Sequence, residues 1–231
     1  MKQNMGMAPK NLLCFSHLRW DFLLQRPQQL LLRFANDTNV FFVENPVFDA
    51  KEGPYLSFGT RSETLWKLVP HLRPGLSSGQ ITKCMTRLID EFLVNADLDN
   101  WTFWYYTSSA LAFTKKHKPK LTIFDCMDEV SMFRRSPEEM TILEKKLVEK
   151  ADLVFTQGYS QHDNRKTFHA NVHSFPCVDP YTDTVRTLSW DDTYTAMFRL
   201  IRHAATGKSN HRKLLHTISY SDQSTMLSKG N

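Results

Sequence analysis

Several features that would assign this chain to a specialised class are missing from its sequence. It contains no run of eighteen or so apolar residues that could span a membrane, and residues 1–10 lack the apolar core of a signal peptide. Its few cysteines, Cys14, Cys84, Cys126 and Cys177, lack the paired spacing of disulfide frameworks and zinc sites. The sequence therefore predicts a cytoplasmic protein with reduced thiols, and we expect neither a metal nor a bound cofactor.

The excess of positive charge is concentrated at one end of the chain. All 231 residues together carry a formal net charge of +5. The segment from Arg202 onward holds five basic residues and one acidic residue, a net charge of +4, which leaves about +1 for the rest. We therefore expect no nucleic-acid partner. Residues 203–231 are interpreted as a basic, disordered tail, and contact with the acidic inner membrane surface is the alternative interpretation.

The remaining pattern indicates an α/β protein. Short apolar runs alternate with helical segments, which is typical of an open parallel sheet flanked by helices. A chain of 231 residues can hold one such Rossmann-like domain with appendages, but it is too short for two. Strands are expected at 12–15, 40–44, 65–69, 101–106, 121–124, 153–155 and 172–175, and helices from 27, 81, 137, 160 and 190.

Polar side chains come directly after the first expected strand. Four apolar residues, 12–15, suit a central strand that is buried on both faces. The loop after it carries Ser16, His17, Arg19, Trp20 and Asp21, at the edge where open α/β sheets bind ligands. Residues 16–26 contain no glycine, which argues against a flavodoxin-like phosphate loop.

The same loop carries a resemblance. The string Phe-Ser-His-Leu-Arg-Trp-Asp at 15–21, with Gln-Arg-Pro-Gln at 25–28, resembles the opening of bacterial GT-B glycosyltransferases of the teichuronic-acid and surface-polysaccharide type, which are GT4-like. Segments 122–129, 151–156 and 171–176 also resemble signatures of that family. One departure is Gln157-Gly158, where such enzymes often carry two glycines. The resemblance implies a Rossmann-like acceptor-side domain over 11–179, after a flexible N-terminus at 1–10.

The chain beyond residue 179 resembles a different part of those enzymes. Residues 188–194 are similar to the last helix of the family, which crosses back onto the N-terminal domain. Segment 180–202 is therefore expected to be a linker and a C-terminal crossover helix with an apolar stripe. The resemblance implies that the donor-binding domain, which normally stands between these parts, is missing.

The resemblance also suggests site residues. It implies that the loop lines the cleft and meets the acceptor, with His17 and Asp21 as catalytic residues. The residues expected to bind the acceptor are Arg19, Trp20, Arg26, Tyr106, Asp125, Asp128 and Glu129. Structural alternatives stay open for several of them: Trp20 packs at an interdomain face, Asp21 pairs with Arg26, and Asp128 or Glu129 caps a short helix. Core packing explains the aromatic strand equally well, and Tyr106 at its end stays open between the core and the acceptor site.

These observations leave two functions open. The first is a glycosyltransferase that moves a sugar from a nucleotide-sugar donor, with retention, to a glycan or glycolipid acceptor, and that is impaired here because the donor domain is absent. The second is a non-catalytic module that binds a glycan or a partner protein. A missing domain would leave an apolar face near Trp20, Phe22 and Tyr106 exposed, so self-association through that face is a further expectation.

Overall fold

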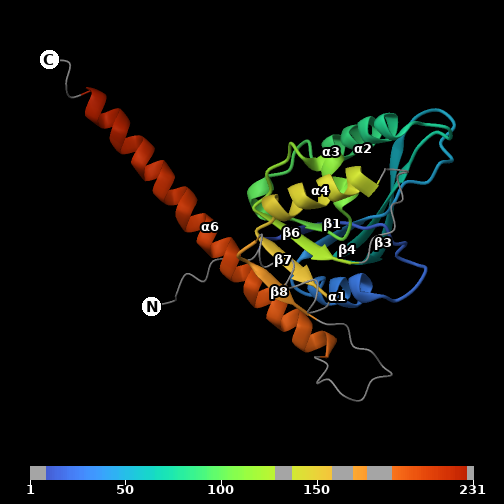
Figure 1. The fold of residues 1–231 in the computed structure, drawn as a ribbon, viewed down its shortest axis with the longest axis horizontal. Coiled ribbons are helices and arrows are strands. Elements are labelled where there is room, and N and C mark those ends of the chain that lie inside the picture. The colour runs from blue at the N-terminus through green and yellow to red at the C-terminus, as the bar shows by residue number, and fades with distance from the viewer. Residues whose placement is uncertain (1–8, 128–136, 158–168, 176–188, 228–231) are drawn as a thin grey trace.

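A single mixed sheet runs through the middle of the molecule (Figure 1). The computed structural model describes residues 9–127, 137–157, 169–175 and 189–227, with side chains of the last helix described as far as Lys208. Within these residues the strand order is β3-β4-β2-β1-β5-β6-β7-β8. The strands are β1 (Asn11–Phe15), β2 (Asn39–Val43), β3 (Tyr55–Ser62), β4 (Leu65–His71), β5 (Trp101–Tyr105), β6 (Leu121–Cys126), β7 (Leu153–Thr156) and β8 (Val172–Ser174).

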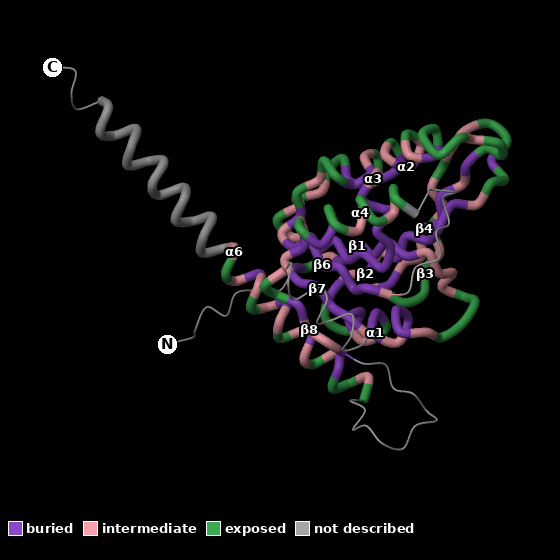
Figure 2. Tube along the Cα trace, in the orientation of Figure 1, coloured by how far each residue is buried: buried purple, intermediate pink, exposed green. Residues whose placement is uncertain are grey.

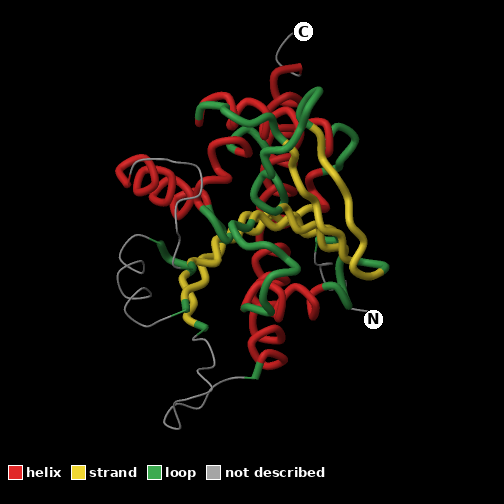
Figure 3. Tube along the Cα trace, turned by 90° about the vertical axis from the view of Figure 1, so that its right-hand side faces the viewer, coloured by secondary structure: helices red, strands yellow, loops and turns green. Residues whose placement is uncertain are grey.

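Helices cover both faces of this sheet (Figure 3). Side chains alternate along β1: Leu13 and Phe15 join one core, and Leu12 and Cys14 join the other. The first core lies under α2 (Ser78–Phe92), α3 (Leu111–Thr114) and α4 (Pro137–Lys150), and the second lies under α1 (Arg26–Phe34) and α6 (Trp190–Leu227). Two short 3₁₀ turns, Leu98–Asn100 and Ser108–Ala110, flank β5. Buried residues accordingly concentrate in the strands (Figure 2).

The structure confirms the predicted fold class. The sheet is mainly parallel, β1 lies centrally between β2 and β5, and helices flank it. One strand was not predicted from the sequence: β3, which pairs antiparallel with β4 at the edge of the sheet. Most β3 side chains are exposed or half-buried, so this strand carries no continuous apolar run that would reveal it.

The expected crossover helix docks onto the second core, beside α1. Met197, Ile201 and Ala205 are buried in that core. The ring of Tyr194 packs edge-on against Phe34, with ring centroids 4.9 Å apart. Burying a large apolar side chain contributes roughly 1.5–3 kcal/mol, so this stripe is enough to hold the helix.

The structure differs from the sequence interpretation beyond this stripe. Residues 203–231 were expected to be a disordered tail, whereas α6 continues as one helix to Leu227. Figure 1 shows the second half of α6 extending away from the sheet. No proline interrupts residues 202–227, so the backbone can continue the helix that the docked stripe nucleates.

Candidate functional site

A hollow opens where β1, β2 and β5 end. These three strands are parallel, so their carboxyl ends meet at one edge of the sheet, the usual place for ligands in open α/β sheets. The hollow is lined by Phe15, Ser16, Val43, Glu44, Asn45, Met85, Thr107, Ala110 and Phe113. Polar side chains from three strand ends thus stand beside an apolar wall.

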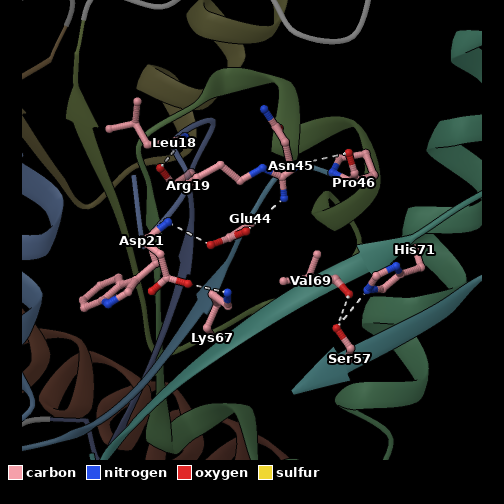
Figure 4. Close-up of polar contacts among 12 residues, drawn as sticks. Leu18, Arg19, Asp21, Glu44, Asn45, Pro46, Ser57, Lys67, Val69 and His71 are labelled. Atoms are coloured by element: carbon pink, nitrogen blue, oxygen red, sulfur yellow. Dashed lines mark hydrogen bonds and ion pairs between the residues drawn. The ribbon is translucent and has the colours of Figure 1, made fainter. Parts of the chain in front are cut away.

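Glu44 fixes the loop that comes after β1. Its side chain is only 3% exposed, and its carboxylate accepts a hydrogen bond from Arg19 Nη1 at 2.9 Å. The other carboxylate oxygen accepts the backbone N–H of Trp20 at 2.8 Å. Figure 4 shows Glu44 close to Arg19 and Asn45. Charge-assisted hydrogen bonds of this kind are about twice as strong as neutral ones, so Glu44 holds the loop in place.

Two amides complete this support. Asn45 Nδ2 donates to the carbonyl of His17 at 3.0 Å. Gln28 Nε2, at the start of α1, donates to the carbonyls of Arg19 and Trp20, both at 3.3 Å. Glu44, Asn45 and Gln28 were not predicted from the sequence. Glu44 is the last residue of a predicted strand and Asn45 comes directly after it, so the strand-end rule that selected the β1 loop could have found them as well.

The structure places the predicted loop residues in different surroundings. His17 is half-buried and adjoins Ser16, which lines the hollow. Arg19 points toward Glu44 and the carbonyl of Pro46. Trp20 packs edge-on against Phe42, with ring centroids 5.0 Å apart, so it covers the α1-side core. His17 is therefore the predicted catalytic residue nearest in sequence to the hollow, but its own side chain is not among those that line it.

Asp21 belongs to an ion-pair cluster on the β3–β4 hairpin. Arg61 Nη2 lies 2.5 Å and Lys67 Nζ lies 2.7 Å from the Asp21 carboxylate. Hydrogen bonds from Arg61 and then Lys67 lower the pKa of Asp21. Asp21 is not among the described residues that line the hollow. Asp21 thus pairs with Arg61 and Lys67 and not with Arg26, its expected partner. The catalytic role of Asp21 stays a prediction, and the geometry does not support it.

Arg26 and Asp125 form a buried ion pair with each other. Their side chains are 2% and 0% exposed, and Arg26 Nη2 lies 3.1 Å from Asp125 Oδ1. Arg26 Nη1 also donates to the carbonyl of Phe175 at 2.9 Å, which ties α1 to the end of β8. Burial raises the pKa of Asp125, and Arg26 opposes this rise. The pair lies beneath the surface, so the geometry favours a structural role over the predicted acceptor contact.

Tyr106 is likewise internal. It is 1% exposed and packs beside Trp104 in the α1-side core. Burial raises the pKa of its hydroxyl, and the nearby Asp125 adds to the rise. This position favours the core alternative over acceptor binding. The other two predicted acceptor residues, Asp128 and Glu129, lie outside the described residues.

Comparison with known proteins points to one architecture. No protein-family profile matches the sequence, and no curated protein is significantly similar to it. Among solved structures, the E. coli structure described as trehalose-6-phosphate bound with UDP-2-fluoro glucose aligns with a TM-score of 0.51 at 10% identity, over 74% of this chain and 49% of that chain. A sucrose-phosphate synthase chain from Thermosynechococcus elongatus aligns with a TM-score of 0.52 at 10% identity, over 84% of this chain and 98% of that chain.

These neighbours are GT-B glycosyltransferases. The chain has the fold of one half of a GT-B enzyme. It spans about half the length of the E. coli chain it matches. The resemblance to the GT-B class is thereby confirmed at the level of fold, whereas the teichuronic-acid type stays a prediction.

An apolar loop lies on the surface of this half-domain. Phe22, Leu23 and Leu24 are 77%, 56% and 64% exposed. They lie between α1 and the part of the β1 loop that Glu44 and Asn45 hold in place. Of the three residues near which an exposed apolar face was expected, Phe22 is exposed, Trp20 is half-buried and Tyr106 is buried. Among the described residues no helix is long and apolar enough to cross a membrane, and no group of potential ligands could hold a metal ion.

Proposed function

We propose that this chain is the acceptor-side half of a GT-B glycosyltransferase and that the carboxyl edge of its sheet, around the small hollow, binds a sugar-bearing acceptor. The acceptor class is a cell-surface glycan or glycolipid, met in the cytoplasm against the inner membrane surface. The sugar comes from a nucleotide-sugar donor that a donor-binding domain must supply. Transfer proceeds with retention at the anomeric carbon.

The observation that carries this proposal is the position of the hollow in this fold. It lies at the carboxyl edge of the sheet, and Glu44 and Asn45 hold the β1 loop beside it in one conformation. The E. coli neighbour was solved with UDP-2-fluoro glucose, a nucleotide-sugar analogue, which supports a donor of this class. Sugar hydroxyls need fixed hydrogen-bonding partners, which a loop of this rigidity can offer.

The proposal implies that binding and transfer are separable in this chain. Glycosyl transfer depends on holding two substrates together and on stabilising the departing diphosphate. A half-domain that holds only the acceptor lacks both contributions. The chain alone should therefore bind an acceptor but transfer no sugar.

Calorimetry tests this proposal directly. Glucose 6-phosphate, maltotriose and a short-chain lipid-linked N-acetylglucosamine serve as acceptor probes, and UDP-glucose and GDP-mannose serve as donors. We expect at least one acceptor probe to bind and both donors to fail. Glu44→Gln and Asn45→Ala should each weaken acceptor binding about tenfold, which corresponds to about 1.4 kcal/mol. Glu63→Gln, at an exposed carboxylate on the β3–β4 turn, is the matched control and should bind like the wild type.

Two outcomes would contradict the proposal. Micromolar donor affinity, or transfer of radiolabel by this chain alone, would show that the chain holds a donor site. Failure of every acceptor probe, together with native circular dichroism, would show that the hollow is not an acceptor site.

A non-catalytic binding module is the second candidate. The alignment covers 98% of the sucrose-phosphate synthase chain, so a chain of similar extent has the same fold. This supports a module that folds as one unit. Radiolabelled nucleotide sugar in a bacterial extract separates the two functions. Label that enters an acceptor with the wild-type chain but not with Glu44→Gln supports the enzyme half. Acceptor binding with no chain-dependent labelling supports the module.

A further inference from the structure

A second polar cluster lies at the outer edge of the sheet, on the β3–β4 hairpin. Ser57 Oγ on β3 lies 3.0 Å from His71 Nε2 on β4. The other ring nitrogen, His71 Nδ1, lies 2.7 Å from Asp49 Oδ1 in the segment between β2 and β3. Figure 4 shows Ser57 and His71 facing each other. None of these three residues lines the hollow described above.

The hydrogen bonds of this cluster have a fixed direction when the imidazole is neutral. An ionised carboxylate can only accept hydrogen bonds, so the proton of the neutral His71 ring must lie on Nδ1, toward Asp49. Nε2 then carries a lone pair and accepts the hydrogen bond of the Ser57 hydroxyl. This is the order of groups that activates a serine: hydroxyl, base, and a carboxylate that orients the base.

The backbone holds each member of the cluster in place. Val47 N donates to Pro70 O at 2.8 Å, and Ala50 N donates to Leu72 O at 3.0 Å. These bonds fix the segment that carries Asp49 against the end of β4. Ser57 is paired in register with Val69 in the antiparallel hairpin. The contacting groups therefore sit on a rigid scaffold, as reactive groups require.

Tyr55 restricts the imidazole further. Its ring stacks on His71 with centroids 4.4 Å apart and an angle of 1° between the planes. A stacked ring opposes rotation of His71 about its side-chain bonds, which preserves the contacts of both ring nitrogens. Ser57 Oγ also contacts the carbonyl of Val69 at 3.4 Å, which is the longer of its two contacts. The geometry favours the hydrogen bond to Nε2.

The cluster is open to solvent on the Asp49 and Tyr55 side. The Asp49 side chain is 52% exposed and Tyr55 is 50% exposed. Because β4 runs parallel to β2, His71 also lies at the carboxyl edge of the sheet. A small molecule can therefore approach the hairpin from solvent without entering the hollow.

We propose that Ser57 is an activated nucleophile that takes an acyl group from a small activated ester, independently of glycosyl transfer. Ser57 Oγ attacks the carbonyl carbon, and its proton passes to His71 Nε2. The bond to the ester oxygen then breaks, and the leaving alkoxide or phenolate takes that proton. Water hydrolyses the acyl-serine by the reverse route and regenerates Ser57. Asp49 is a positioning residue that keeps the Nε2 lone pair directed at Ser57.

A fluorophosphonate probe tests the nucleophile in the intact chain. Attack by Ser57 forms an oxygen–phosphorus bond and releases fluoride, and peptide mass spectrometry locates the adduct. We expect labelling of Ser57 in the wild type and none at this position in Ser57→Ala. Ser62→Ala, at an exposed serine of the same hairpin whose hydroxyl contacts Thr64, is the matched control and should label like the wild type.

Two variants test activation by the relay. His71→Ala should slow labelling about 100-fold, which is within the usual range for loss of a general base. Asp49→Asn should also slow labelling, because its amide can donate to Nδ1 and then favours the ring form with the proton on Nε2. This exposed substitution changes the tautomer rather than the fold, and thermal melting of each variant checks that the fold is intact. With p-nitrophenyl acetate, the wild type should release p-nitrophenolate faster than Ser57→Ala.

The outcomes decide the proposal. Labelling of Ser57 that depends on His71 and Asp49 supports it. Absence of an adduct at Ser57 would overturn it, and so would an adduct whose rate is unchanged in a folded His71→Ala or Asp49→Asn variant. Neither of these results bears on acceptor binding at the hollow.

Discussion

The buried ion pair between Arg26 and Asp125 gives the sharpest stability prediction. Both side chains are almost completely buried, and Arg26 Nε and Nη2 contact the carboxylate at 3.1 to 3.4 Å. Replacing Asp125 with leucine leaves the guanidinium without its counter-charge in the protein interior. Removing one partner of a buried pair typically costs about 3–5 kcal/mol.

This cost can be converted into a melting temperature. For a domain of this size, 1 kcal/mol corresponds to a shift of about 2–4 °C. Asp125→Leu should therefore lower Tm by about 6–20 °C, and Arg26→Met should do the same. The double variant should recover much of the loss, because no unpaired charge is left inside. It should not recover fully, since the carbonyl of Phe175 loses its donor, a bond of about 1.5–3 kcal/mol.

Urea denaturation at neutral pH, followed by circular dichroism, measures all four proteins of this double-mutant cycle. We expect a coupling energy of about 3 kcal/mol between the two sites. Strictly additive single effects would refute the reasoning. A folded Asp125→Leu protein that melts within about 2 °C of the wild type would refute it as well, because that shift corresponds to less than about 1 kcal/mol.

Three further predictions concern other parts of the fold. Met197→Ala should lower the free energy of unfolding in urea by about 2–5 kcal/mol. The control Arg199→Ala, at an exposed position of the same helix, should change that free energy by less than about 0.5 kcal/mol. Equal stability of the two variants would show that α6 is not docked. Burial raises the pKa of the Cys14 thiol, so iodoacetamide should modify Cys14 only after unfolding, and rapid modification of the native protein would contradict this. Arg61 and Lys67 lower the pKa of Asp21. The stability that these ion pairs give the folded protein is present above the unfolded-state pKa of Asp21 and is lost as the pH falls through its folded-state pKa. Asp21→Asn should therefore melt below the wild type at neutral pH and together with it at about pH 2, and a difference that persists in acid would count against the ion-pair cluster.

Local signals in the sequence were enough to predict most of the elements. Apolar runs such as residues 12–15 are continuous because both faces of a central parallel strand are covered. The spacing of Met197 and Ile201 predicted the docked face of α6 for the same reason, since helical periodicity reflects one buried side. β3 was not predicted because an exposed edge strand does not need a continuous run of apolar residues.

The candidate site was predictable only as a region. The strand-end rule located the β1 loop and His17, and the structure places that loop beside the hollow. The strand-end rule could not predict which side chains pair with one another, because the partners are distant in sequence. Arg26 meets Asp125 across 99 positions, and Asp21 meets Lys67 across 46 positions.

The sequence by itself determined the α/β class, the central first strand and the docking face of the last helix, because these depend on the burial pattern of neighbouring residues. Only the tertiary structure decided the roles of individual polar residues. It buried Arg26, Asp125 and Tyr106, drew Asp21 to the hairpin, and brought Glu44 to the loop that the sequence had singled out. A charged side chain pairs with the group that the packed sheet brings within hydrogen-bonding distance. The separation of two residues along the chain does not predict that distance in space.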